Sequence, residues 1–319
     1  MLKQLVNECL IRLKIVPTGP ILIKSGIPTL SGPDMAFVTT WRNGRQEVYL
    51  PGSSLKGVLR SHAERIARTL SPAASCNPFK DANDPEAFCG TCFEERKNAK
   101  EKLDNPTVYS DSCPICRLFG STWYAGRLAT EDAYAIDGAP RPEQRDGVGI
   151  DRFTGGAAQG AKFDLEVVTG GVFITHLHLR NFELWQLGLL GFVVADLKDR
   201  LIRVGCGKSR GLGQIEGTVE KVRLDYLGPH APQPVEGRLS LKGVGEMVLD
   251  SVAGKYGMAR PDSVSVPAPE APTGNALRTT FCWQGTAFPW EALGPLWVEK
   301  AEGYDNPPGM IPYRAGRRR

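Results

Sequence analysis

The sequence has no apolar run long enough to cross a membrane. Its most hydrophobic stretch, Leu184–Leu197, is shorter than the roughly 20 residues that a transmembrane helix needs, and it contains polar side chains. The first residues carry charges within their apolar part and show no cleavage pattern of a signal peptide. We therefore expect a cytoplasmic protein without a membrane partner, in which the eight cysteines have a role other than disulfide formation.

Common hydrolase and nucleotidase signatures are also missing. The chain has four histidines, and we find neither a Ser–His–Asp pattern nor a paired-carboxylate motif with supporting context. Gly207-Lys208-Ser209 resembles the end of a phosphate-binding P-loop, but the first glycine of that motif would fall at Ile202. The stretch also follows a predicted helix instead of a strand, so we exclude a nucleoside-triphosphate site.

The charge is nearly balanced overall, but it is unevenly distributed. Lys and Arg number 39 against 35 Asp and Glu, a net charge of +4 that is not diagnostic by itself. The segment Thr39–Thr69 contains two glutamates and six basic residues, namely Arg42, Arg45, Lys56, Arg60, Arg65 and Arg68. This local excess points toward an anionic partner.

Hydrophobic periodicity predicts an α+β fold. Asn7–Ile23 and Gly170–Asn181 alternate apolar and polar residues as strands do. Apolar residues recur at helical spacing after Pro51 and again over Phe182–Arg200, which predicts two helices. Gly147–Val168 is predicted to be a hairpin with a small, Gly-rich tip. Strands interleaved with two helices fit a modified ferredoxin-like sandwich with large insertions.

The composition divides the chain into two parts. Residues 1–227 form the predicted main domain, with a polar insertion at 71–120 and the hairpin at 147–168. Prolines become frequent after Leu227, and the pattern weakens. We therefore treat 228–319 as an appendage of unassigned fold.

The start of the first predicted helix has the features of an anion-binding device. Pro51-Gly52-Ser53-Ser54 is a turn followed by two good N-cap residues, and Lys56 and Arg60 lie outside the apolar stripe. Free backbone N–H groups at a helix N-terminus, reinforced by cations, attract anions. The pattern alone leaves open a small phosphate, a nucleic-acid backbone, or a helix that is merely solvated.

The polar insertion contains paired cysteines at the spacing of a structural zinc site. Two C-x₂-C pairs, separated by twenty residues, comprise Cys89, Cys92, Cys113 and Cys116. Four thiolates close a tetrahedron and leave no open position, so we expect the Zn²⁺ to stabilise the insertion without taking part in chemistry. Cys76 is a fifth cysteine nearby that could replace one of the four.

Three further features carry weak signals on their own. The Gly-rich loop Arg203–Gln214 allows close backbone approach to a ligand beside Lys208 and Arg210, or it is a tight structural turn. His62 falls on the apolar stripe of its helix, which favours packing over catalysis. Asp34 follows Gly-Pro and by itself favours a turn or cap role.

Taken together, four stretches resemble one family. YLPGSSLKGVLRSHAERIA, CPICRLFGS, GIDRFTGGAAQGAKFDLEVV and VGCGKSRGLGQIEG occur here in the order seen in RAMP-superfamily backbone subunits of type III CRISPR–Cas effector complexes, the Csm/Cmr-type backbone family. The resemblance covers about residues 5 to 225. The segment from Gly228 onward is not part of the minimal family pattern.

The resemblance implies an RRM-like core that stacks along a guide RNA beside further copies, paralogues or other effector subunits. It implies that the first helix and the Gly-rich loop hold guide-RNA phosphates, and that the hairpin is a thumb inserted between bases. The residues to which it assigns RNA contact are Ser53, Ser54, Lys56, Arg60, Ile150, Arg152, Phe153, Lys208 and Arg210.

The resemblance also implies a catalytic aspartate. In this family a loop aspartate ahead of the PGSSLK helix cleaves target RNA with a divalent metal, Mg²⁺ or Mn²⁺, and Asp34 occupies that place. Some paralogues only bind RNA, so a non-catalytic scaffold or cap subunit is the alternative. A second alternative is a metal-independent guide-processing endoribonuclease that uses His62.

Overall fold

The computed structural model describes residues 3–26, 32–80, 88–138, 140–270 and 272–304. Residues 27–31, which precede Asp34 in the sequence, lie outside them. An antiparallel sheet of seven strands forms the centre, with neighbours in the order β14-β15-β11-β1-β10-β6 and β7 paired to β10. The strands are β1 (Asn7–Pro17), β6 (Leu128–Thr130), β7 (Tyr134–Ala135), β10 (Phe173–Arg180), β11 (Ile215–Leu227), β14 (Thr273–Gly274) and β15 (Arg278–Gln284).

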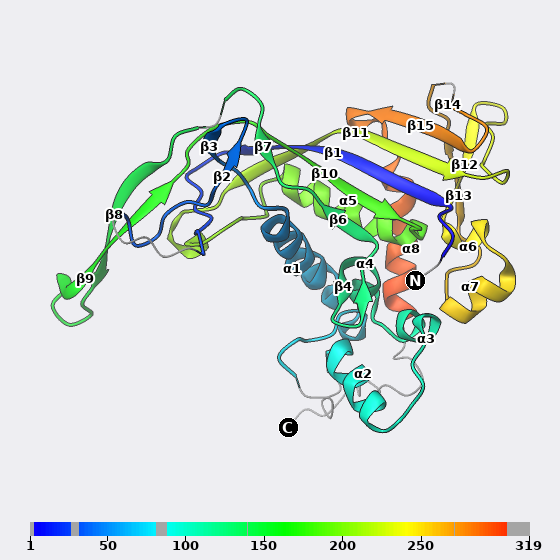
Figure 1. Cartoon of the computed structure of the whole chain (residues 1–319), viewed down its shortest axis with the longest axis horizontal. Helices are drawn as coiled ribbons and strands as arrows, with labels where there is room; N and C mark the ends of the chain where they lie inside the picture. The colour runs from blue at the N-terminus through cyan, green and yellow to red at the C-terminus, as the bar shows by residue number, and fades with distance from the viewer. Residues whose placement is uncertain (1–2, 27–31, 81–87, 139, 271, 305–319) are drawn as a thin grey trace.

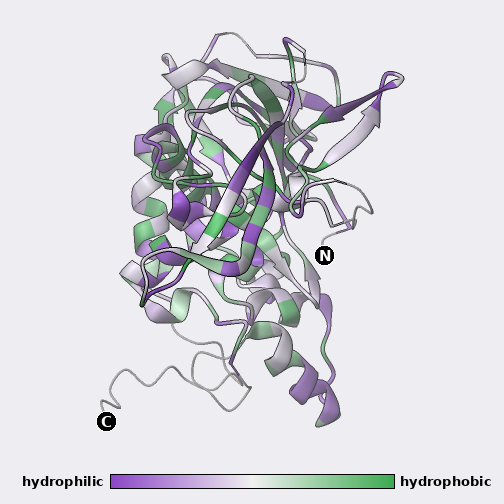
Figure 2. Cartoon of the chain, turned by 90° about the vertical axis from the view of Figure 1, so that its left-hand side faces the viewer, coloured by the Kyte–Doolittle hydropathy of each residue, from purple (hydrophilic) through white to green (hydrophobic). Residues whose placement is uncertain are grey.

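Two long helices cover one face of the sheet. They are α1 (Gly52–Leu70) and α5 (Leu184–Lys198), and Figure 1 shows both on the same side of the strands. The alternation predicted for β1 and β10 is confirmed, because Ile11, Leu13 and Leu177 are fully buried beneath the helices. Hydrophobic segments gather in the interior and hydrophilic ones at the periphery (Figure 2). The α+β class predicted from the sequence is therefore confirmed.

The segment after Leu227 continues the main sheet and helix layer. Strand β15 pairs with β11 from Leu227↔Arg278 to Lys221↔Gln284. Helix α8 (Trp290–Glu302) packs against α5, where Trp185 and Trp297 lie 5.9 Å apart between ring centroids. The remaining elements here are β12 (Arg238–Lys242), α6 (Val244–Met247), α7 (Asp250–Tyr256), β13 (Ser263–Pro267) and η3 (Gly285–Ala287).

Two excursions leave the main body. The first is the cysteine-bearing insertion after α1, with η1 (Pro72–Ala74), α2 (Cys89–Asn98), α3 (Asn105–Ser110), α4 (Pro114–Phe119), β4 (Gly120–Ser121) and β5 (Tyr124–Ala125). The second is the predicted hairpin, formed by β8 (Glu143–Ile150) and β9 (Ala157–Val167), which extends away from the sheet in Figure 1. A shorter hairpin joins β2 (Thr39–Arg42) to β3 (Arg45–Val48).

Within the described part of the chain, none of the helices has the length and apolar character that a membrane span requires.

Candidate metal centre and nucleic-acid interface

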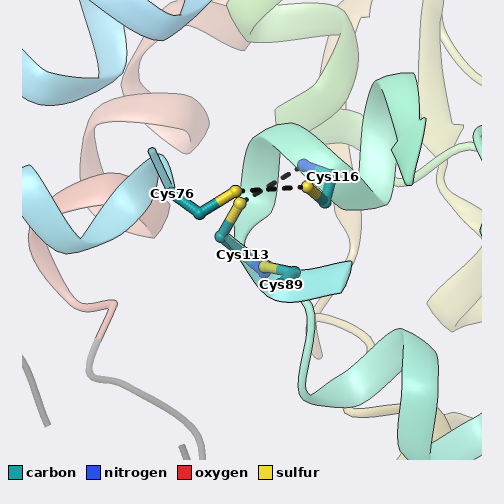
Figure 3. A group of neighbouring side chains, drawn as sticks. All are labelled: Cys76, Cys89, Cys113 and Cys116. Carbon is teal, nitrogen blue, oxygen red and sulfur yellow. Dashed lines mark hydrogen bonds between the residues drawn. The ribbon is translucent and has the colours of Figure 1, made fainter. Parts of the chain in front are cut away.

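Four buried cysteines converge at the junction of α1 and the insertion. Cys76 follows η1, Cys89 begins α2, and Cys113 and Cys116 lie at the start of α4. Figure 3 shows their side chains turned toward one another, and the four Sγ atoms all lie within 4.8 Å of one another. The cluster is consistent with a structural zinc site.

The four clustered sulfurs differ by one from the ligand set predicted from the sequence, and the difference is Cys76, the replacement that the sequence left open. Cys92 is buried one helical turn after Cys89, but its thiol is not among the four clustered sulfurs. Cys76 takes that place, because the chain after α1 folds back and the Arg68 guanidinium donates to the Cys76 carbonyl at 2.8 Å. Sequence spacing favoured Cys92 because Cys76 has no C-x₂-C partner.

The donor set fits zinc. A tetrahedron with Zn–S bonds of about 2.3 Å places sulfurs about 3.8 Å apart, and Cys76 Sγ lies 3.5 Å from Cys116 Sγ. Backbone N–H groups donate to two of the sulfurs, from Cys113 to Cys89 at 3.3 Å and from Cys116 to Cys113 at 3.4 Å. The chemistry of four buried thiols with N–H donors matches a closed structural zinc site.

Arg60, assigned to RNA by resemblance, connects α1 to this cluster. Its guanidinium donates to the Gly120 carbonyl at 2.9 Å, to Cys116 Sγ at 3.5 Å and to Glu64 at 3.0 Å. Burial opposes its charge, but Cys116 and Glu64 outweigh burial and raise the pKa of Arg60. All three contacts lie within the protein, so the described structure gives Arg60 a supporting role at the cysteine cluster.

The other predicted residues of α1 remain at the surface. The Gly52 N–H donates to the Asp132 carboxylate at 2.7 Å, which occupies the first donor of the helix N-terminus. Ser53 is exposed, and Ser54 and Lys56 are half-buried. Burial and the nearby Arg60 lower the pKa of Lys56, whose ammonium has no hydrogen bond or ion pair among the described residues.

The Gly-rich loop packs closely against the segment that follows β1. Its η2 turn (Lys208–Arg210) is exposed, and the Cys206 N–H donates to the Leu22 carbonyl at 2.7 Å. A Cβ at Gly205 would lie 2.0 Å from that carbonyl, and Gly205 has a φ of +72°. The positive φ and the nearby Leu22 carbonyl both require glycine at position 205. The loop therefore presents Lys208 and Arg210 on a rigid support.

The β8–β9 hairpin presents apolar side chains to solvent. Phe153 is 100% exposed and Ile150 is 60% exposed, and Arg152 between them is also exposed. The Asp151 carboxylate accepts from the backbone N–H groups of Phe153 and Thr154, each at 2.8 Å, which shapes the tip. Several exposed apolar side chains on one hairpin, Val148, Ile150 and Phe153, are typical of a contact surface.

Asp34 lies at the base of this hairpin. Its carboxylate is exposed, and one oxygen accepts the Asp164 N–H at 3.1 Å. Met35 forms a parallel bridge to Leu165, and the Arg210 guanidinium lies 5.5 Å above the Phe163 ring. Strand β9 therefore brings together Asp34, the hairpin and the Gly-rich loop.

The comparisons with known proteins identify the family. The RAMP superfamily model matches residues 14–216, which include α1, the cysteine cluster, the hairpin and the Gly-rich loop. The chain belongs to the RAMP superfamily. Membership in this family implies CRISPR-associated RNA binding. No curated protein matches the chain.

One prominent surface residue of this RAMP protein was not predicted from the sequence. Trp41, in β2, is 74% exposed. Asn43-Gly44 between two short β-prone runs is a hairpin signal that locates it, and both residues have positive φ, 51° and 76°. The sequence signal predicts the hairpin, but the exposure of Trp41 depends on how the hairpin packs against the rest of the protein.

Proposed function

We propose that this RAMP protein is a guide-RNA-binding backbone subunit of a type III CRISPR effector, which cleaves complementary target RNA through Asp34. The observation that carries the proposal is the convergence on β9, where Asp34, the hairpin and the basic Gly-rich loop meet. The family match supports RNA as the polymer that this surface binds. Guide, target and other effector subunits are the proposed partners.

The topology supports a ferredoxin-like core with RRM-type organisation. The chain runs β1-α1-β6-β10-α5-β11, while the sheet places these strands in the order β11-β1-β10-β6. This split β-α-β arrangement is the one expected for that fold. Strands β14 and β15 extend the sheet beyond β11.

The RNA contacts proposed here are electrostatic and independent of base sequence. Exposed or partly exposed cations on α1 and η2 suit phosphates, and the exposed tip of the hairpin suits contact with bases. Arg60 is removed from the set because its guanidinium is bonded within the protein. The remaining residues are Ser53, Ser54, Lys56, Ile150, Arg152, Phe153, Lys208 and Arg210.

Asp34 is the proposed catalytic residue. One carboxylate oxygen is fixed by the Asp164 N–H, and Asp164 itself has a buried side-chain oxygen without a hydrogen-bond partner in the described chain. Such oxygen donors fit Mg²⁺ or Mn²⁺, which when bound polarises the scissile phosphate. The protein holds Asp34 at the base of the hairpin, where the carboxylate orients the attacking 2′-hydroxyl.

The guide-processing alternative has less support from the structure. His62 Nε2 lies 2.6 Å from the Asp196 carboxylate, and the pair joins α1 to α5. This polar contact links the two main helices and gives the histidine a structural role between them. The scaffold alternative shares the RNA-binding surface and differs only in whether Asp34 cleaves.

Salt dependence of RNA binding tests the proposed surface. Lys56→Ala combined with Lys208→Ala removes two phosphate contacts, so the slope of log affinity against log salt should fall by about 1.4 for single-stranded RNA. Fluorescence anisotropy of a labelled guide RNA measures it. Lys255→Ala, on exposed α7 surface of the C-terminal segment, is the matched control. An unchanged slope in the double variant would contradict the proposed surface.

A further inference from the structure

Helices α5 and α8 enclose an apolar groove at the protein surface. Glycines let the two helices approach each other, since a Cβ at Gly191 would lie 3.0 Å from the Trp290 ring. A Cβ at Gly294 would lie 3.2 Å from the Phe192 ring, which is 40% exposed. The groove has a volume of about 850 Å³, and the apolar side chains in its lining are Phe192, Ala195, Trp290, Pro295 and Val298. A concave apolar surface is typical of a binding site.

The charged side chains in this lining are all acidic. They are Glu291, Glu299 and Glu302, which lie within about 80° of one another around the axis of α8. All three are exposed, and none of their carboxylates has a hydrogen bond or an ion pair within the described part of the chain. Lys300, in the same turn as the last two, lines a different pocket. The groove therefore presents carboxylates that no described cation neutralises.

The last turn of α8 is an unfavourable place for two of these carboxylates. The C-terminal end of a helix carries a partial negative charge, which favours cations over anions by about 0.3–1 kcal/mol for each exposed group. Glu299 and Glu302 lie three residues apart at the end of α8, so their like charges also repel each other. The groove thus suits an occupant that brings cations together with apolar side chains.

The sequence that follows α8 has this composition. Residues 305–319 lie outside the described residues, and their sequence combines Met310, Ile311 and Tyr313 with a single acidic residue, Asp305. The cations in the same stretch are Arg314, Arg317, Arg318 and Arg319. The dipeptides Asn-Pro and Pro-Pro and a glycine, all before Met310, are typical of a turn.

The length and the starting point of this segment fit the groove. Tyr304 is buried two residues after Glu302, so residues 305–319 begin at the C-terminal end of the groove. Helix α8 rises about 17 Å from Glu291 to Glu302, a distance that five or six extended residues cover. Because the segment is tethered, its effective concentration at the groove is on the order of 1 mM, and weak binding is enough to fill it.

We infer that the groove between α5 and α8 binds the arginine-rich segment 305–319 of the same chain. Met310 and Ile311 lie against the apolar lining, and the arginines pair with the glutamates of α8. The inference does not depend on the proposed function, because neither the groove nor the segment belongs to the proposed RNA-binding surface.

Limited trypsin digestion of the full-length protein tests the inference without RNA. Trypsin cleaves after Arg314, and mass spectrometry compares the rate with that of an isotope-labelled peptide with the sequence of residues 305–319 in the same tube. If the peptide binds with a Kd of about 0.1 mM, an effective concentration of about 1 mM leaves about one tenth of the segment undocked. Cleavage in the protein should then be about 10-fold slower than in the peptide.

Charge and apolar contact are tested by separate variants. Glu299→Lys combined with Glu302→Lys should remove most of the protection. The matched control makes the same charge change at two exposed glutamates of the C-terminal segment, Glu236→Lys with Glu270→Lys, and should retain the protection. Met310→Ser with Ile311→Ser changes only the segment itself, and it should also lose protection relative to a peptide with the same two changes.

Three results would overturn the inference. The first is equal cleavage of the wild-type protein and the peptide. The second is protection that survives the double change at Glu299 and Glu302, because the segment would then bind elsewhere. The third is protection that increases with protein concentration, which would assign the groove to the segment of a second copy instead of the same chain.

Discussion

Arg60 shows how a single side chain joins helix α1 to the cysteine-bearing insertion. From the surface helix α1 it donates to the Gly120 carbonyl and to Cys116 Sγ. Hydrogen bonds that involve a charged group contribute about 1.5–3 kcal/mol, and a cation beside metal-bound thiolates offsets their negative charge. Arg60 therefore supports the cysteine cluster from outside the ligand set.

We predict that Arg60→Ala destabilises the zinc site more than it weakens RNA binding. The midpoint temperature of thermal unfolding should fall, corresponding to a loss of about 1.5–3 kcal/mol in the free energy of unfolding. A chelator should also extract the metal faster. RNA affinity should change less than in Lys56→Ala. Arg65→Ala, which removes an exposed cation of the same helix, should leave both readouts unchanged. A large loss of RNA affinity with normal zinc retention would contradict this assignment.

We predict that Cys76 binds zinc and that Cys92 does not. Cys76→Ser should abolish stoichiometric zinc, while Cys92→Ser should retain one equivalent by metal analysis. Cobalt substitution provides a second readout, because four thiolates give a stronger sulfur-to-cobalt charge-transfer band than three. Retention of the full band in Cys76→Ser and its loss in Cys92→Ser would restore the ligand set predicted from spacing.

These residues show what local patterns can and cannot predict. Paired C-x₂-C spacing predicted Cys113 and Cys116 together, because a short knuckle brings its own two thiols together, but Cys92 stays outside the cluster that Cys89 joins. Cys76 lies 13 residues before Cys89, so its approach depends on the return of the chain against α1, which spacing does not encode. The sequence places Arg60 outside the apolar stripe of its helix, but its partners Gly120 and Cys116 come from a distant segment that the stripe does not reveal.

At the level of elements, the Gly-rich loop depends on close backbone contact. Gly205 and Gly211 both have positive φ, 72° and 84°, but only Gly205 faces a carbonyl that a Cβ would strike. Side chains in this left-handed region cost about 1–2 kcal/mol. A substitution at Gly211 therefore reports the cost of the positive φ alone, whereas one at Gly205 adds the clash with the Leu22 carbonyl.

We predict that Gly205→Ala lowers the free energy of unfolding by clearly more than Gly211→Ala, whose cost should be about 1–2 kcal/mol. Because Gly205 packs on Leu22, its replacement should also displace Lys208 and reduce RNA affinity. Chemical denaturation and RNA anisotropy measure the two effects. Equal destabilisation by both variants would show that the close approach to Leu22 contributes nothing.

Element prediction succeeded where the period was regular. The alternation of β1 and β10 and the apolar pattern of α5 predicted those elements, and the small glycine-rich tip predicted the β8–β9 hairpin. Strands β6 and β7 are separated by a turn in which the Asp132 carboxylate accepts the Gly52 N–H at the start of α1. That division follows from tertiary contact, as does the anchoring of the β2–β3 hairpin by Tyr134.

At the scale of the whole molecule, the C-terminal segment completes the core. Helix α8 lies on α5, with Gly188 so close to the Leu293 carbonyl that a Cβ would lie 2.3 Å from it. Trp297 is fully buried there. This region shows no regular apolar period in the sequence, because most of its elements are short and bury their faces against distant partners.

We predict that Trp297→Ala lowers the free energy of unfolding by about 3–5 kcal/mol, as for other large-to-small changes in a core. Denaturant titration should show a single transition in which the sheet and the C-terminal segment unfold together. A variant that loses only local structure, with the main transition unmoved, would show that residues 228–319 are energetically separate. Leu249→Ala, which removes a 75% exposed side chain, is the control.

Cleavage of a labelled complementary RNA by the guide-loaded complex in Mg²⁺ tests the central claim most directly. Wild type, Asp34→Asn and the matched control Asp137→Asn, an exposed aspartate outside the site, should bind the target equally. The account predicts that Asp34→Asn loses one or more cuts while Asp137→Asn retains them all. An unchanged cutting pattern in Asp34→Asn would contradict catalysis by this chain and leave a subunit that holds guide and target for another to cut.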